Sequence, residues 1–137
     1  MLRENGFAKM PKCILSVSYD VALLATRRMM LEQKGYRVTS ALGFTTALEA
    51  CNHSHYDLFI LGHSIPAKDK TALIRSFREN CNAPILSLER SGEERIPCDF
   101  HASPDNPEEL LEKVEAILNL LDTPQDSKRQ SDNARVN

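Results

Sequence analysis

Residues 58–66 read LFILGHSIP, an unbroken apolar run that stops at Gly62 and passes into a short polar segment before Pro66. Such a run is typical of a parallel strand that is covered on both faces of its sheet. In open α/β sheets, the carboxyl end of a strand borders the crevice where ligands and chemistry usually lie. The residue at this end is glycine, which has no side chain. The expected reason is backbone freedom or the close approach of the next loop, and the alternative is an opened cavity for a ligand.

Short strand-like runs alternate with longer helix-like runs along the rest of the chain. This alternation predicts a parallel sheet with crossover helices, an α/β fold. Segment 88–97, LERSGEERIP, has no apolar face, so the fourth helix is predicted to be shortened or absent. We predict strands at 12–18, 36–41, 57–61, 83–88 and 98–102, and helices at 21–34, 44–52, 67–79 and from Pro107 to Leu121.

Length and charge narrow the class of protein. The 137 residues fit one domain, which we place at 11–121, after an N-terminal extension at 1–10 and before a polar tail at 122–137 that is expected to be disordered. The formal net charge is −2 and no basic stripe is present, so nucleic acid is not an expected partner. No apolar run approaches the about 20 residues that cross a bilayer, and the first residues are too polar for a signal peptide. A cytoplasmic protein with no membrane partner is expected.

The cysteines do not form a metal-binding pattern. Cys13, Cys51, Cys81 and Cys98 lack CxxC spacing, so reduced thiols are expected. In the stretch CNHSH, Cys51, His53 and His55 could offer ligands to zinc or copper, but no fourth ligand can be named, and a plain polar loop is favoured. No metal and no cofactor are expected.

Three stretches resemble the receiver domain of bacterial response regulators, the CheY-like family. They are ILSVSYDVALLATRRMMLEQKGYRV at 14–38, YDLFILGHSIPAKD at 56–69 and CDFHASPDNPEELL at 98–111. The resemblance covers about residues 11–121. It implies a doubly wound, five-stranded parallel sheet with strand order 2-1-3-4-5.

The same resemblance implies a site at which this chain departs from the family. Receivers transfer a phosphoryl group to an aspartate, with an acidic pair that holds Mg²⁺, a Thr or Ser and a Lys. Here the phosphoacceptor position is Gly62, the acidic-pair positions are Ser18 and Tyr19, the Thr/Ser position is Glu89, the Lys position is Ser103, and the switch aromatic is Phe100. Glycine cannot form an acyl phosphate, and Asp57 lies at the opposite end of its strand. We therefore predict a degenerate receiver without catalytic or metal-binding residues.

Two functional hypotheses follow from this pattern. The first is a stand-alone pseudo-receiver, a phosphorylation-independent protein-interaction module in two-component signal transduction, with no enzymatic activity. Its protein partner and its oligomeric state stay open. The second is a small-ligand sensor at the carboxyl ends of strands one and three, with hydroxyls and one carboxylate but no cation in its lining. The residues expected to line that site are Ser18, Tyr19, Gly62, His63, Glu89 and Ser103.

Three weaker alternatives also stay open. An enzyme of unrelated chemistry on the same sheet lacks support, because no nucleophile elbow or metal-ligand spacing joins the serines, histidines and carboxylates. Conventional phosphorylation would have to use a misaligned residue. Phosphorylation of His63 on nitrogen is the third, and a solvated or capping histidine is favoured over it.

Overall fold

The strands and helices follow the predicted α/β alternation. A computed structural model describes residues 11–122, so the predicted extension at 1–10 and the predicted tail beyond Asp122 lie outside the described residues. The elements, in chain order, are β2 (Cys13–Ser18), α1 (Val21–Gln33), β3 (Arg37–Leu42), α2 (Phe44–Cys51), β4 (Leu58–Leu61), α3 (Ala67–Asn80), β5 (Ile85–Leu88), β6 (Phe100–Ala102) and α4 (Pro107–Asp122). None of these helices is long and apolar enough to span a bilayer.

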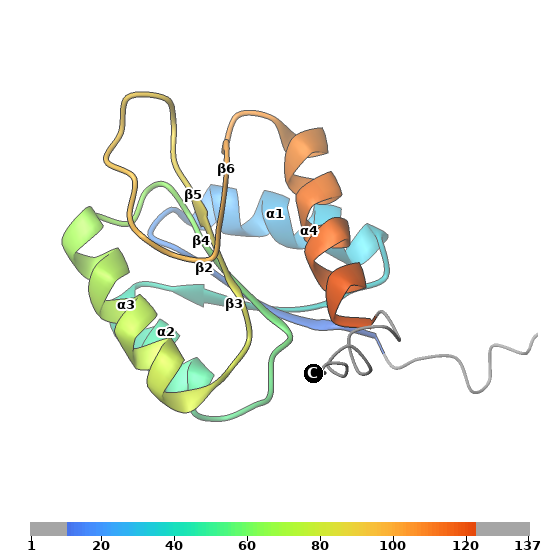
Figure 1. The fold of residues 1–137 in the computed structure, drawn as a ribbon, viewed down its shortest axis with the longest axis horizontal. Coiled ribbons are helices and arrows are strands. Elements are labelled where there is room, and N and C mark those ends of the chain that lie inside the picture. The colour runs from blue at the N-terminus through green and yellow to red at the C-terminus, as the bar shows by residue number, and fades with distance from the viewer. Residues whose placement is uncertain (1–10, 123–137) are drawn as a thin grey trace, which may run out of the picture.

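All five strands are parallel and form one sheet in the order β3-β2-β4-β5-β6. This confirms the predicted order 2-1-3-4-5. Helices α1 and α4 cover one face of the sheet, and α2 and α3 cover the other (Figure 1). The central strand β4 is buried along its whole length, which explains why its sequence is continuously apolar.

Local signals in the sequence fix where the helices begin and end. Asp20 caps α1, because its carboxylate accepts hydrogen bonds from the Ala22 and Leu23 amides at 2.9 and 3.1 Å. Gly35 follows α1 with φ +95°, a left-handed conformation that favours glycine. Asn106 caps α4 by accepting a hydrogen bond from the Glu109 amide at 3.0 Å.

A loop replaces the helix that would usually separate the last two strands. Residues 89–99 contain no helix and run beside the N-terminal end of α3 (Figure 1). The loop is anchored at Ile96, which is 3% exposed and packs into the core beneath α2 and α3. It is also anchored at Asp99, whose carboxylate accepts a hydrogen bond from the Ile85 amide at 2.8 Å. The segment therefore covers the sheet without regular secondary structure.

We expect Asn106→Ala to lower the free energy of unfolding by about 1 kcal/mol, because the first turn of α4 loses its side-chain cap. Urea denaturation measures the change. Asn106→Ser is the matched control, since serine keeps a capping oxygen and should retain most of the stability. Equal losses in the two variants would contradict a capping role.

Candidate functional site

The carboxyl ends of the strands meet at one edge of the sheet. Val17 of β2 pairs with Leu61 of β4, Leu61 pairs with Ser87 of β5, and Ser87 pairs with His101 of β6. This register brings together the sequence-predicted positions that directly follow or end these strands, which are Ser18, Gly62, Glu89 and Ser103. The structure thus gathers at one edge the positions that sequence comparison had assigned to the degenerate site.

The space beside Gly62 is occupied by an arginine. A Cβ atom built on Gly62 would lie 3.2 Å from Nη1 of Arg27 and 3.2 Å from the carbonyl oxygen of Val17. Both separations are shorter than ordinary van der Waals contact. Arg27 comes from α1 and is only 5% exposed. A side chain at position 62 would therefore need Arg27 or Val17 to shift by a few tenths of an ångström, and the close approach comes from α1 and β2 rather than from the next loop as expected. The expectation that the site holds no cation is wrong.

Arg27 belongs to the buried face of its helix. The buried residues of α1 are Leu24, Arg27 and Leu31. Their spacing places them on the face of the helix that packs against the sheet. The sequence contained this signal, since Arg27 lies three residues after one leucine and four before the other. A long cationic side chain next to apolar residues usually extends to solvent. For that reason the spacing alone did not predict that Arg27 would be buried.

The electrostatics of Arg27 are unfavourable. Its Nη1 is buried and has no hydrogen-bond partner among the described residues. Burial lowers the pKa of the guanidinium, and the negative charge of Asp20 acts in the opposite direction. Arginine nevertheless stays protonated in proteins. The site therefore contains a buried positive charge with one donor atom unpaired.

Two serine hydroxyls link the end of β2 to the loop after β4, at the acidic-pair position Ser18. Ser18 is fully buried, and its Oγ shares a 2.9 Å hydrogen bond with Oγ of Ser64. Ser18 Oγ also accepts from the Asp20 amide at 3.0 Å, and Ser64 Oγ accepts from the Tyr19 amide at 3.0 Å. Sequence reasoning missed Ser64, because nothing in its local sequence points to a partner 46 residues away.

Tyr19, at the other acidic-pair position, is hydrogen-bonded to α3. Its hydroxyl donates a 2.7 Å hydrogen bond to the carboxylate of Asp69, in the first turn of α3. Its ring packs against the core beneath α2 and α3. Burial raises the pKa of Tyr19, and the hydrogen bond and charge of Asp69 raise it further, so the phenol stays protonated. The hydroxyl of Tyr19 therefore links the segment after β2 to α3.

A buried charge pair lies at the end of β5. Lys70 is 3% exposed, and its Nζ donates to Ser87 Oγ at 2.9 Å and to the Leu88 carbonyl at 2.8 Å. The same nitrogen lies 3.6 Å from Oε2 of Glu89, whose side chain is 8% exposed. Ser87 Oγ in turn donates to Glu89 Oε2 at 2.6 Å. Burial lowers the pKa of Lys70, and Glu89 opposes that shift.

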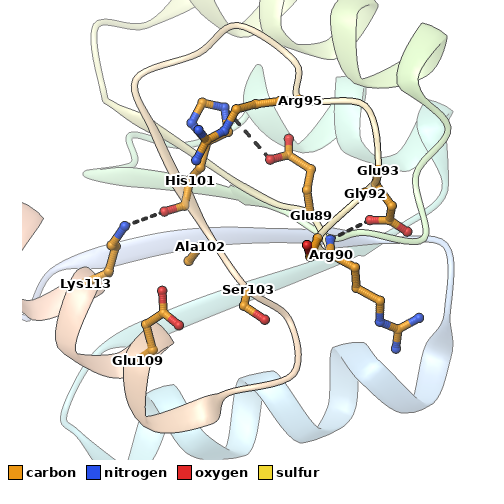
Figure 2. A pocket seen from close by; sticks show the side chains of 11 residues that line it. Glu89, Arg90, Gly92, Glu93, Arg95, His101, Ala102, Ser103, Glu109 and Lys113 are labelled. Atoms are coloured by element: carbon orange, nitrogen blue, oxygen red, sulfur yellow. Dashed lines mark hydrogen bonds and ion pairs between the residues drawn. The ribbon is translucent and has the colours of Figure 1, made fainter.

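His101 of β6 adds polar contacts next to the Lys70–Glu89 pair. Nε2 of His101 hydrogen-bonds the Ile96 carbonyl at 2.7 Å and lies 3.9 Å from Oε1 of Glu89. Lys113 of α4 donates to the His101 carbonyl at 2.6 Å. Glu89, His101 and Lys113 line a pocket that also includes Ser103 (Figure 2). Its volume is about 310 Å³.

The two remaining family positions on β6 and its loop have ordinary local contacts. Ser103 Oγ accepts a 3.1 Å hydrogen bond from the amide of Asp105, so it forms a local turn. Phe100, at the switch-aromatic position, is half-buried and packs against the core on the α1 and α4 side. Neither side chain supplies the cation that the family has at the position of Ser103.

The candidate ligands in CNHSH do not come together. Cys51 is buried in α2, whereas His53 is exposed and the His55 side chain is 84% exposed. No group of three or more potential metal ligands occurs within residues 11–122. Asp57 lies at the opposite end of the sheet, where its carboxylate accepts a hydrogen bond from the Cys13 amide at 2.8 Å.

The residues at the crevice do not fit Mg²⁺. A magnesium ion needs oxygen ligands in octahedral geometry, usually carboxylates. Asp20 is the one carboxylate in the loop after β2, and its Oδ1 already caps α1. Arg27 adds a positive charge that would repel a divalent cation. The arrangement supports fixed hydrogen bonds and ion pairs between loops.

We expect Gly62→Ala to lower the free energy of unfolding by about 1 kcal/mol, because crowding against Arg27 and Val17 outweighs the entropy gained by replacing glycine. In an Arg27→Leu background the same change should cost less, because the shorter side chain leaves room for the methyl group. Chemical denaturation of the four proteins gives this double-mutant cycle. The same cost in both backgrounds would contradict the contact.

We expect Lys70→Met to lower the free energy of unfolding by about 3 kcal/mol, because it leaves Glu89 as a buried charge without its cation. Lys70→Met combined with Glu89→Leu should recover part of that loss. Lys68→Met, at an exposed position in the same helix, is the matched control and should change stability by less than about 0.5 kcal/mol. A double variant less stable than Lys70→Met alone would contradict the pairing.

Comparison with known proteins places this geometry in a family context. No protein-family model matches the chain. The chain is 29% identical over 113 residues to the transcriptional regulatory protein ResD of Bacillus subtilis, covering 77% of this chain and 47% of ResD. It is also 29% identical over 116 residues to the protein PetR of Rhodobacter capsulatus, covering 79% of this chain and 49% of PetR. The chain thus spans about half the length of these curated relatives.

The fold agrees with these relatives. A two-component response regulator from Clostridium difficile superposes with a TM-score of 0.73 at 24% identity, covering 82% of this chain and 99% of that structure. Its likeness shows the fold, and the matches to ResD and PetR add the relationship in sequence. The chain is thus similar in sequence to ResD and PetR, and it shares its fold with solved CheY-like receiver domains of response regulators.

Proposed function

We propose that this domain acts in two-component-type signal transduction as a protein-interaction module that does not depend on aspartate phosphorylation. The observation that carries the proposal is the packing of Arg27 against Gly62. The space next to the phosphoacceptor position holds part of the protein itself. The proposal includes a protein partner in a signalling pathway, and it includes neither enzymatic activity nor a nucleic-acid or membrane partner.

The chemistry of phosphoryl transfer supports this proposal. Transfer to a protein needs a nucleophile and a cation that neutralises the charge developing on the phosphoryl oxygens. Gly62 offers no nucleophilic side chain, and Ser18 and Tyr19 are bound to Ser64 and Asp69. A metal-dependent transfer at this edge would have to break several buried contacts before it began.

The Lys70–Glu89 pair supports the proposal that the domain does not depend on aspartate phosphorylation. In the family that this domain resembles, the side chain after the fourth strand meets the phosphoryl group. Here Glu89 occupies that position and already contacts Lys70, Ser87 and the Ile96 amide. The loop after β5 is therefore held by internal contacts whether or not a phosphoryl donor is present.

The surface beside β5 and β6 is the part of the domain to which we assign the protein partner. Loop 89–99 replaces the helix between these strands, so this side presents different residues from those of a receiver with that helix. Arg90, Glu93 and Arg95 are exposed on it. We propose that the protein partner binds this loop.

The test compares the domain with and without a mimic of aspartyl phosphate. Amide-resolved NMR with Mg²⁺, and then with Mg²⁺ and beryllofluoride, should show no saturable shifts at Ser18, Gly62, Glu89 or Ser103. A receiver with an intact phosphoacceptor aspartate serves as the positive control. A partner recovered from the host lysate should then bind with the same affinity in both conditions. Local saturable shifts, or an affinity that depends on beryllofluoride, would contradict the proposal.

A small-ligand sensor is the second candidate function. The observation that favours it is the presence of two buried nitrogen atoms, Nη1 of Arg27 and Nδ1 of His63, without hydrogen-bond partners among the described residues. Buried polar atoms in native proteins are usually hydrogen-bonded to protein, water or ligand.

A further inference from the structure

Strand β3 forms one edge of the sheet, and its outer side pairs with no strand among the described residues. Its inner side is bonded to the chain segment that carries β2, because the amides of Arg37 and Gly43 donate to carbonyl oxygens of that segment at 2.9 and 3.1 Å. The backbone groups of successive strand residues point to opposite sides. The amides and carbonyls of Val38, Ser40 and Leu42 therefore point to the open edge.

This edge lacks several features by which proteins usually prevent pairing with another chain. Such features are proline, inward-pointing charge, a β-bulge or a very short strand. Strand β3 has six residues, RVTSAL, with no proline among them. Its register with β2 runs without interruption from Arg37 to Leu42, so it contains no bulge. Its one charged side chain, that of Arg37, lies at the first position and is exposed. The edge is therefore long enough to accept another strand.

Open space borders the first half of this edge. A groove of about 550 Å³ is lined by Arg37, Val38 and Thr39 of β3 together with Arg28 and Glu32 of α1. The two α1 side chains form an ion pair with each other at 2.9 Å. The helix beside β3 therefore leaves this part of the strand uncovered.

Two side chains of β3 lack contacts that a further strand would supply. Oγ of Ser40 is buried and has no hydrogen-bond partner among the described residues, although buried hydroxyls are usually hydrogen-bonded. Leu42 is 47% exposed. Both lie on the same face of the sheet as Val38, because alternate residues of a strand share a face. Val38 belongs to the core on the α1 and α4 side. An antiparallel strand along the edge would bring a polar partner to Ser40 and an apolar neighbour to Leu42.

We propose that two copies of this chain associate through β3, edge to edge and antiparallel, around a two-fold axis at Ser40. In this register Ser40 faces Ser40 of the second copy, and Val38 faces Leu42 on either side of the axis. A closed two-fold dimer requires the antiparallel direction. The three facing pairs turn their backbone groups to one another and exchange about six hydrogen bonds. A specific interface typically carries about 10 ± 5 hydrogen bonds, so the pairing is of sufficient size.

Charge favours this register. The axis at Ser40 places Arg37 of one copy opposite Gly43 of the other, and the two arginines lie at opposite ends of the shared edge, roughly 20 Å apart at ~3.3 Å per residue. An axis at Val38 would bring the two arginines close together, and like charges across paired strands are destabilising. An axis at Thr39 would turn the backbone groups of the facing residues away from each other. The register centred on Ser40 avoids both problems.

The experiment measures amide hydrogen exchange of the whole chain by NMR at a low and a high protein concentration, with sedimentation velocity to determine the mass. The mass should shift reversibly from monomer to dimer. The amides of Val38, Ser40 and Leu42 should exchange about tenfold or more slowly in the concentrated sample. The amides of Thr39 and Ala41 point to β2, so they should be protected at both concentrations and serve as internal controls.

Variants separate this edge from other surfaces. Ser40→Pro removes a donor that points outward, so the monomer keeps its pairing with β2 while the dimer should weaken about tenfold or more. Leu42→Lys, at an exposed position, should also weaken the dimer and provides the test if Ser40→Pro does not fold. Leu120→Lys changes a leucine of α4 that is 58% exposed and should leave the association unchanged. A chain that stays monomeric, a dimer whose three outward amides exchange as fast as in the monomer, or a dimer that neither β3 variant weakens would overturn the inference.

This inference goes beyond the proposed function and does not rest on it. Strands β3 and β6 are the two edges of the sheet, so loop 89–99 lies at the opposite edge from the dimer contact. A monomeric chain that gives no response to beryllofluoride would overturn the dimer alone. A dimer in which beryllofluoride with Mg²⁺ shifts the Gly62 and Glu89 amides saturably would overturn phosphorylation independence alone.

Discussion

The contact between Arg27 and Gly62 is the constraint on which the rest of the site depends. The guanidinium of Arg27 reaches from α1 to the end of β4, and its Nη1 lies 3.2 Å from the position that a Cβ on residue 62 would take, so a larger residue there would need a neighbour to shift. The same contact places a fixed positive charge at the edge where related domains use a metal ion. Under the proposed function, fixed contacts within the protein stand in place of chemistry that needs a nucleophile and a divalent cation.

The other substitutions are physically consistent with this replacement. Ser18 binds Ser64, Tyr19 binds Asp69, and Glu89 binds Lys70. The first pair joins the ends of β2 and β4, and the other two join the segments after β2 and β5 to α3. Buried ion pairs contribute little net stability but cost a great deal when broken, so they favour one arrangement of the loops. The domain thus has internal contacts where a conventional receiver has ligand contacts.

The fold was predictable because its signals are local. The apolar run at 58–61, the caps at Asp20 and Asn106 and the glycine at position 35 specify strands and helix ends within a few residues. The site was predictable only in part. The chain positions of Gly62 and Glu89 follow from sequence, but the partners Arg27 and Lys70 do not. Their long side chains reach the site from helices, and which face of a helix meets which strand is a tertiary property.

The most direct measurement of the central claim is a nuclear Overhauser experiment on the free protein. The account predicts cross-peaks between the Gly62 Hα protons and the side-chain protons of Arg27, unchanged when Mg²⁺ is added. It also predicts slow exchange of the guanidinium protons, because the group is buried. An Arg27 side chain without contacts to Gly62, or with rapid exchange like that of Arg28, would show that the space beside Gly62 is open and would contradict the account.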